Sequence, residues 1–164
     1  MSTILSNKIN QIVVFSLGEL EFGVEITEIK EIIKMTRIVK LPEEIEYIEG
    51  IINLRGSVTP IINLRKRFNI PDSYSDQDRI IISENDGKQI GFIVDSVTEV
   101  LKIDNDSIHA PQGKLSEVEK YLVGIGKVNN RILLIINLYS LLTNTRVIDL
   151  QQMNSNAEGL VEKQ

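Results

Sequence analysis

One stretch of the chain decides the fold: residues 47–65, which read YIEGIINLRGSVTPIINLR. Two short apolar runs flank Arg55-Gly56, and runs of this length bounded by turn residues suit buried strands better than independent helices. Gly56 tolerates the positive φ that a tight hairpin turn needs, so backbone geometry explains this residue. The stretch therefore predicts a β-hairpin with its turn at Arg55-Gly56.

The same stretch recurs further along the chain. Residues 47–51 (YIEGI) lie 74 positions before residues 121–125 (YLVGI), and the same offset places the IINL of residues 61–64 on the IINL of residues 135–138. Chance coincidence among the many Ile, Val and Leu residues is the alternative. The shared tyrosine, glycine and asparagine argue against it.

Upstream of this stretch the repeat has an offset of 68. Residues 31–34 (EIIK) fall on residues 99–102 (EVLK), and Gly23 falls on Gly91. The change of offset is absorbed between Lys102 and Tyr121, where Asp, Asn, Pro and Gly are typical of loops. Because a repeat organises the whole fold, we interpret the chain as two similar halves, about 12–66 and 80–142.

Each half begins with short segments rich in Ile, Val and Phe, which predict strands at residues 11–17, 20–26, 79–83 and 89–94. Helix is limited to a short one at 64–69 and a C-terminal one from Leu138 toward Leu150. Halves of this size are too small for a large sandwich, so we expect each to close into a small barrel. The polar residues 151–164 predict a flexible tail.

Composition excludes several classes of protein. The chain has 164 residues, 18 Lys and Arg against 23 Asp and Glu, a net charge of -5 and no cysteine. The negative charge disfavours nucleic-acid binding, and the missing thiols exclude disulfides and Cys-ligated metal sites. The sequence shows neither an apolar run of about 20 residues nor a signal peptide, so the expected compartment is the cytoplasm.

No familiar catalytic constellation is present in the sequence. A phosphate-binding glycine loop, a Gly-x-Ser-x-Gly elbow and a His-Glu-x-x-His zinc motif are all missing. His109 is the sole histidine, and we interpret it as a surface residue. The acidic residues near it are interpreted as solvated loop charges rather than a catalytic pair: Asp104, Asp106, Glu117 and Glu119. We therefore expect no enzymatic activity, no cofactor and no metal.

Residues 47–65, with Asn-Leu-Arg-Gly at their centre and Pro60 after it, resemble the signature segment of the CheW family of chemotaxis coupling proteins. The resemblance continues through residues 15–24, 91–97 and 121–126, and covers roughly residues 11–142. It implies a mainly β protein with two five-stranded Src-homology-three-like barrels, one per repeat, within a single CheW-like domain over residues 1–150.

The resemblance also implies a function. Proteins of this family are non-catalytic adaptors that couple methyl-accepting chemoreceptors to the regulatory domain of the histidine kinase CheA. The receptor tip is expected to dock near the groove between the barrels, and the kinase at a barrel end. The chain itself would then be monomeric, would bind no nucleic acid, and would reach the membrane only through receptor clusters.

Four residues are candidates for receptor binding. Arg55 is a long cation at a tight turn where the second repeat has Asn129, so it needs either a partner or water. Glu31 is the candidate carboxylate for a pair with it. Ile29 and its repeat equivalent Val97 are candidate contacts for a receptor helix. A merely structural ion pair and ordinary core packing are the respective alternatives.

Two interpretations remain open beside this one. The basic run at residues 65–67 reads as a solvated helix face, with kinase docking as the alternative. For the whole chain, the alternatives to a chemotaxis adaptor are the same adaptor in a non-chemotactic pathway and a ligand-binding or enzymatic β-barrel protein.

Overall fold

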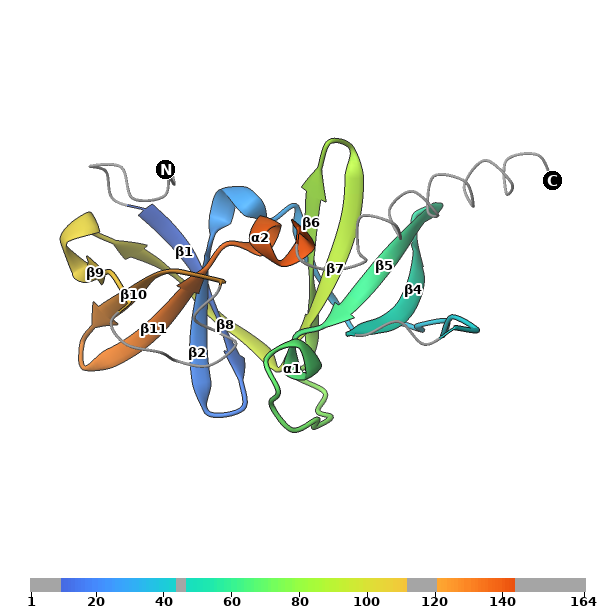
Figure 1. The fold of residues 1–164 in the computed structure, drawn as a ribbon, viewed down its shortest axis with the longest axis horizontal. Helices are drawn as coiled ribbons and strands as arrows, with labels where there is room; N and C mark the ends of the chain where they lie inside the picture. The colour runs from blue at the N-terminus through green and yellow to red at the C-terminus, as the bar shows by residue number, and fades with distance from the viewer. Residues whose placement is uncertain (1–9, 44–46, 112–120, 144–164) are drawn as a thin grey trace.

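The computed structural model describes residues 10–43, 47–111 and 121–143, and in this part of the chain the fold is mainly β (Figure 1). The strands form two separate sheets, and two short helices accompany them. The mainly β fold class predicted from the sequence is confirmed. The predicted tail over residues 151–164, and the helix beyond residue 143, lie outside the described residues.

One sheet has five strands. In spatial order they are β3 (Glu31–Lys34), β6 (Arg79–Asn85), β7 (Lys88–Val94), β5 (Ser57–Asn63) and β4 (Ile48–Leu54). Neighbouring strands are antiparallel except β5 and β7, which run parallel.

The other sheet has six strands. In spatial order they are β8 (Ser96–Ile103), β1 (Asn10–Leu17), β2 (Leu20–Glu25), β11 (Arg131–Ile136), β10 (Leu122–Val128) and β9 (Ile108–His109). Its single parallel pairing, between β2 and β11, is the repeat equivalent of the β5 and β7 pairing.

The sheets do not follow the two halves of the sequence, which corrects the expected boundaries of 12–66 and 80–142. The first hairpin of each half lies in the other half's sheet: β1 and β2 join β8 to β11, whereas β6 and β7 join β3 to β5. The reason lies in burial on both strand faces. In β6, Ile80 and Ile82 face the core of their own sheet while Ile81 faces the core between the sheets.

A repeated glycine lies at each parallel pairing, where Gly91 pairs with Ile61 and Gly23 pairs with Ile135. A Cβ atom at Gly91 would lie 2.6 Å from Ile61 Cδ1, and one at the equivalent Gly23 would lie 2.5 Å from Ile12 Cγ2 of the antiparallel neighbour β1. Glycine in a strand is typical of such a close approach. The repeat of these glycines in the sequence therefore marks the two places where the halves exchange strands.

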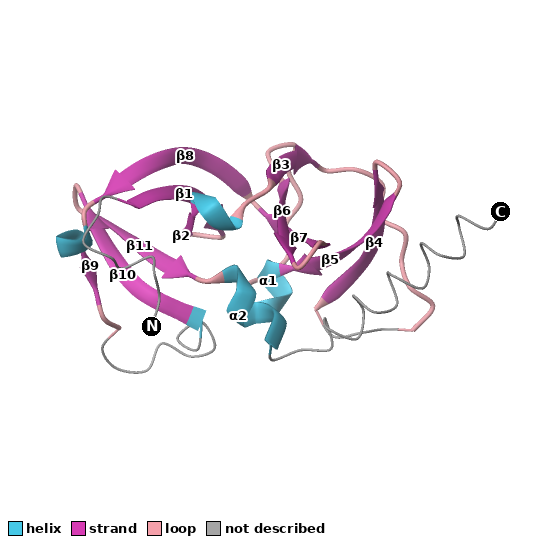
Figure 2. Cartoon of the chain, turned by 90° about the horizontal axis from the view of Figure 1, so that it is seen from above, coloured by secondary structure: helices cyan, strands magenta, loops and turns pink. Residues whose placement is uncertain are grey.

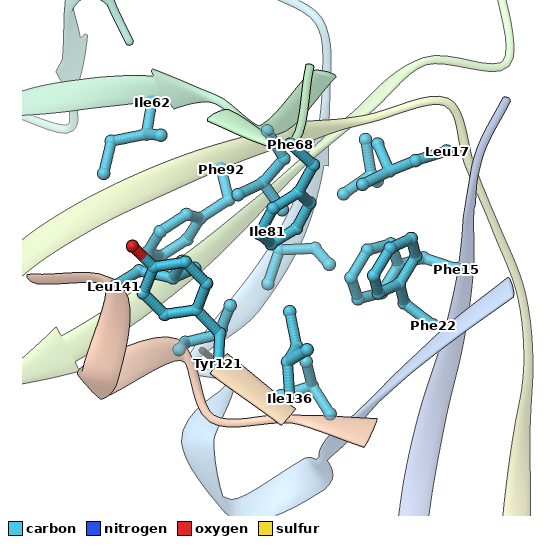
Figure 3. Close-up of a cluster of buried hydrophobic side chains, with 14 of the residues drawn as sticks. Phe15, Leu17, Phe22, Ile62, Phe68, Ile81, Phe92, Tyr121, Ile136 and Leu141 are labelled. Atoms are coloured by element: carbon cyan, nitrogen blue, oxygen red, sulfur yellow. The ribbon is translucent and has the colours of Figure 1, made fainter. Parts of the chain in front are cut away.

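The core has three parts. Each sheet encloses its own aliphatic cluster, and a larger cluster joins the sheets. In this shared cluster the rings of Phe15 and Phe22 stack at 5.5 Å, and those of Phe22 and Phe68 at 5.4 Å (Figure 3). Full burial of each phenylalanine contributes about 1.5–3 kcal/mol, so the shared cluster holds the two sheets together.

Two short helices lie between the sheets (Figures 1 and 2): α1 (Leu64–Arg67) after β5, and α2 (Leu138–Thr143) after β11. Two asparagines that are repeat equivalents precede these helices. Asn63 Oδ1 accepts a hydrogen bond from Arg65 N at 3.0 Å, and Asn137 Oδ1 accepts one from Tyr139 N at 2.8 Å. The repeated Ile-Ile-Asn-Leu sequence is thus a strand end followed by a helix N-cap.

Candidate functional site

The predicted turn at Arg55-Gly56 joins β4 to β5. Both residues have positive φ, 51° for Arg55 and 89° for Gly56, as a two-residue hairpin turn requires. The Gly56 backbone N–H donates to Asn53 Oδ1 at 2.8 Å, which fixes the turn from within. Gly56 thus has the positive φ that the sequence predicts for a tight turn.

The predicted pair between Arg55 and Glu31 is present. Arg55 Nη2 donates to Glu31 Oε2 and so links the end of β4 to the start of β3, the two edges of the five-stranded sheet. A backbone bridge also joins Ile51 of β4 to Val39, in the segment that follows β3, at 2.8 and 2.9 Å. The sheet is therefore curled so that its edges approach each other.

The Arg55 side chain is 64% exposed and that of Glu31 is 26% exposed. An ion pair this open to water adds little to stability, about 0–1 kcal/mol. The guanidinium remains accessible to a partner while Glu31 orients it. This combination favours a recognition role over a purely structural one.

Ile29 and Val97 occupy equivalent places in the fold. The chain passes between the sheets twice, once from β2 to β3 and once from β7 to β8, and one of these residues lies at each crossing. Both are half-buried and pack against the shared core. Ile29 lies two residues before Glu31, whereas Val97 belongs to the other sheet.

The basic run at residues 65–67 is not a solvated helix face, which corrects the interpretation from sequence. Arg65 is 1% exposed and Arg67 is 5% exposed. Arg65 Nη2 donates to Asp78 Oδ1 at 2.8 Å, and its Nε donates to Asp95. Burial disfavours the Arg65 charge, but these two carboxylates outweigh that effect and raise the pKa of the guanidinium.

Asp95 extends this pair across the two sheets. It lies between β7 and β8, and its Oδ2 accepts a hydrogen bond from Gly18 N, in the turn between β1 and β2, at 2.6 Å. The Arg65 cluster (Arg65, Asp78, Asp95 and Gly18 N) therefore fixes one of the two crossings to α1. Asp78 and Asp95 are far from Arg65 in sequence, so local charge pattern gave no signal for it.

Arg67 joins the two repeats in another way. Its guanidinium lies 4.6 Å from the ring centre of Tyr47 and 4.5 Å from that of Tyr121, and these tyrosines are repeat equivalents. Cation–π contacts with desolvated rings contribute up to about 2 kcal/mol. The shared tyrosine that marked the repeat is thus a packing partner for one buried arginine.

The six-stranded sheet has a counterpart of the Arg55 and Glu31 pair. Glu99 is the repeat equivalent of Glu31, and it accepts from Arg131 Nη2 at 2.8 Å. Arg131 also donates to both carboxylate oxygens of Glu21, at 3.1 and 2.7 Å, and this hydrogen bonding lowers the pKa of Glu21. Sequence analysis missed this cluster because Arg131 is displaced by two positions from the equivalent of Arg55.

Glu28 is a carboxyl group whose pKa is raised by burial. It lies in the 3-10 turn Ile26–Glu28, and its Oε1 accepts a hydrogen bond from Leu138 N, the first residue of α2, at 2.9 Å. Burial raises the pKa of Glu28 to about 7, against the smaller opposing effect of the helix N–H groups.

We expect Glu28→Gln to change how stability depends on pH. The pKa of Glu28 is 4.5 in the unfolded chain and about 7 in the folded protein, so folding favours the protonated form. The stability that the protonated form adds is fully present below about pH 4.5 and is lost as pH rises through about 7. Glutamine keeps an acceptor without the charge. The variant should match wild type at low pH and exceed it by about 1–3 kcal/mol above pH 7, measured by urea unfolding. A difference independent of pH would contradict this account.

Among the described residues, no group of three or more His, Cys, Asp or Glu side chains is arranged to hold a metal ion. His109 is exposed on β9, Asp104 and Asp106 are exposed beside it, and Glu117 and Glu119 lie outside the described residues.

No helix in the described part of the chain is long and apolar enough to cross a membrane. The site is a set of surface side chains on a rigid β framework.

Comparison with known proteins decides the family. The family model described as "CheW-like domain" matches residues 11–146, a range that takes in both sheets and both helices. The chain belongs to the CheW-like family. The resemblance seen in residues 47–65 is thereby confirmed over most of the chain.

CheW relatives from distant bacteria are similar along nearly their whole length. "Chemotaxis protein CheW" of Bacillus subtilis is 36% identical over 129 residues, covering 77% of this chain and 83% of that protein. "Chemotaxis protein CheW" of Helicobacter pylori is 30% identical over 138 residues, covering 84% of each. A solved structure, the scaffolding protein TtCheW from Thermoanaerobacter tengcongensis, is 43% identical with a TM-score of 0.73, covering 79% of this chain and 89% of that one.

Proposed function

We propose that this chain is a non-catalytic adaptor of bacterial chemotaxis that couples methyl-accepting chemoreceptors to the histidine kinase CheA. The observation that carries the proposal is the family match over both sheets, together with the similarity to a scaffolding protein of the same fold. A ligand-binding or enzymatic β-barrel is not favoured by these similarities. In the cell the adaptor works in the cytoplasm, as a monomer recruited to receptor clusters.

The receptor surface consists of Ile29, Glu31, Arg55 and Val97. Ile29 and Val97 bring one aliphatic side chain from each crossing between the sheets, which suits the apolar stripe of a receptor helix. Arg55, mostly exposed and oriented by Glu31, adds a charged contact at the same five-stranded sheet as Ile29. At such a site the apolar contacts provide affinity, and the charged contact fixes the position of the receptor helix on the surface.

The kinase surface lies on the other face of the same edge strand. Side chains alternate along β3, so Ile32 points away from the face that carries Glu31. Ile32, Met35 and Val39 are 39%, 38% and 50% exposed. An apolar barrel end of this kind suits the homologous regulatory domain of the kinase, and it leaves the receptor surface free.

The proposal predicts a three-component complex. When the chain is mixed with the regulatory domain of CheA and a receptor cytoplasmic fragment from the same cell, all three should elute together in size-exclusion chromatography. The kinase domain and the receptor fragment mixed without the chain form the control. Elution of the chain with neither partner would reject the proposed function.

A further inference from the structure

The two crossings between the sheets are held by equivalent helices with different chemistry. The crossing from β7 to β8 is tied to α1 through Asp95 and Arg65. The crossing from β2 to β3 is tied to α2 through Glu28, whose carboxylate accepts from Leu138 N. Because α1 and α2 are repeat equivalents, the two connections lie at equivalent helices. We call the connection through Asp95 and Arg65 the Asp95 clamp and the one through Glu28 and Leu138 the Glu28 clamp.

The Glu28 clamp acts on a short segment that follows β2 directly and whose other described long-range hydrogen bonds go to the five-stranded sheet. The Glu28 carbonyl accepts from Ser83 Oγ at 2.9 Å, and Lys30 N donates to the Ile82 carbonyl at 2.8 Å. Both of these partners lie in β6 of the five-stranded sheet. The Glu28 side chain adds a hydrogen bond to α2, the helix that follows β11 of the six-stranded sheet.

We infer that Glu28 is a positioning residue for receptor binding: by fastening the β2 to β3 crossing to α2, it sets Ile29 and Glu31 relative to Val97. This inference rests on the proposed function, because it assumes that these residues contact the receptor. Ile29 lies just before β3 of the five-stranded sheet, and Val97 lies in β8 of the six-stranded sheet. A receptor helix that contacts both is therefore sensitive to the connection between the sheets.

The chemistry of the clamp explains why glutamate suits this position. Leu138 is 1% exposed and Leu141 is fully buried, so the apolar side of α2 is anchored in the shared core. An acceptor placed at the first N–H of such a helix satisfies a group that would otherwise lack an intrahelical partner. Removal of the acceptor frees the crossing, while the core still holds α2 in place.

The test measures affinity for a receptor cytoplasmic fragment by calorimetry, at a temperature where circular dichroism shows every variant fully folded. Glu28→Ala should weaken receptor binding roughly fivefold or more, within the range of ordinary coupling between sites. Glu28→Gln keeps the acceptor and should bind within about twofold of wild type. Affinity for the kinase regulatory domain should not change in either variant.

Two further variants sharpen the result. Glu19→Ala removes an exposed carboxylate from the turn between β1 and β2 and should leave receptor affinity unchanged. Glu28→Asp keeps a carboxyl group but shortens the side chain, so it should weaken receptor binding as alanine does. It also provides the comparison if the alanine variant does not fold.

The possible outcomes separate the two levels of the proposal. Wild-type receptor affinity in Glu28→Ala or Glu28→Asp overturns the positioning role, and so does an equal loss of receptor and kinase binding, which indicates general loosening. A wild-type chain that fails to bind the receptor fragment rejects the proposed function, and the positioning role with it.

Discussion

Replacing Arg65 with alanine is expected to destabilise the protein by about 3–5 kcal/mol, because the substitution leaves buried carboxylates without their counter-charge. Asp78 is 3% exposed and the Asp95 side chain is 19% exposed, so water does not replace the guanidinium. Asp95 also holds the turn at Gly18, so the loss extends to the contact between the sheets. The measurement is the free energy of unfolding from urea denaturation.

Lys66→Ala is the matched control for this substitution. Lys66 is the next residue along α1, its side chain is 50% exposed, and it pairs with Glu49 at 2.8 Å. Its loss should lower stability by no more than about 1 kcal/mol. If Arg65→Ala were as mild as Lys66→Ala, the Arg65 cluster would not contribute to holding the sheets together.

Arg55→Ala is expected to weaken receptor binding about tenfold or more, while the free energy of unfolding falls by no more than about 1 kcal/mol. The hairpin survives because Gly56 and its hydrogen bond to Asn53 keep the turn. The lost guanidinium is largely exposed, so the effect falls on the partner rather than on the fold. Receptor affinity and unfolding free energy are measured side by side.

Glu31→Ala should show a similar receptor defect, because Glu31 orients the Arg55 guanidinium. The double variant should be less than additive in receptor affinity, with a coupling energy of roughly 0.5–3 kcal/mol. Arg131→Ala, which breaks the corresponding pair in the six-stranded sheet, is the control and should leave receptor affinity unchanged. Strict additivity, or unchanged affinity in a folded Arg55→Ala protein, contradicts the receptor role.

Local features of this fold were predictable from the sequence because short-range chemistry determines them. The Arg55-Gly56 turn follows from glycine geometry between apolar runs. The two short helices follow from the helical spacing of apolar residues and from helix stop signals. Family resemblance, and the lack of an equivalent arginine at Asn129, identified Glu31 as the partner of Arg55 before its position in space was known.

Long-range features were not predictable in the same way. The exchange of hairpins between the halves involves strands that are apolar on both faces, so periodicity does not show which sheet a strand joins. Burial of Arg65 depends on Asp78 and Asp95, which the fold brings to it from other elements. Three consecutive basic residues look solvated in a sequence, because charged side chains are seldom fully buried without partners.

The most direct test of the adaptor account is a competition titration with three purified proteins. The dissociation constant of the chain for the CheA regulatory domain is measured alone and again in the presence of saturating receptor fragment. Because the proposed receptor and kinase surfaces use opposite faces of β3, we expect the two constants to agree within about threefold. Displacement of the kinase domain by the receptor fragment, with no three-component complex at any concentration, would contradict the adaptor function.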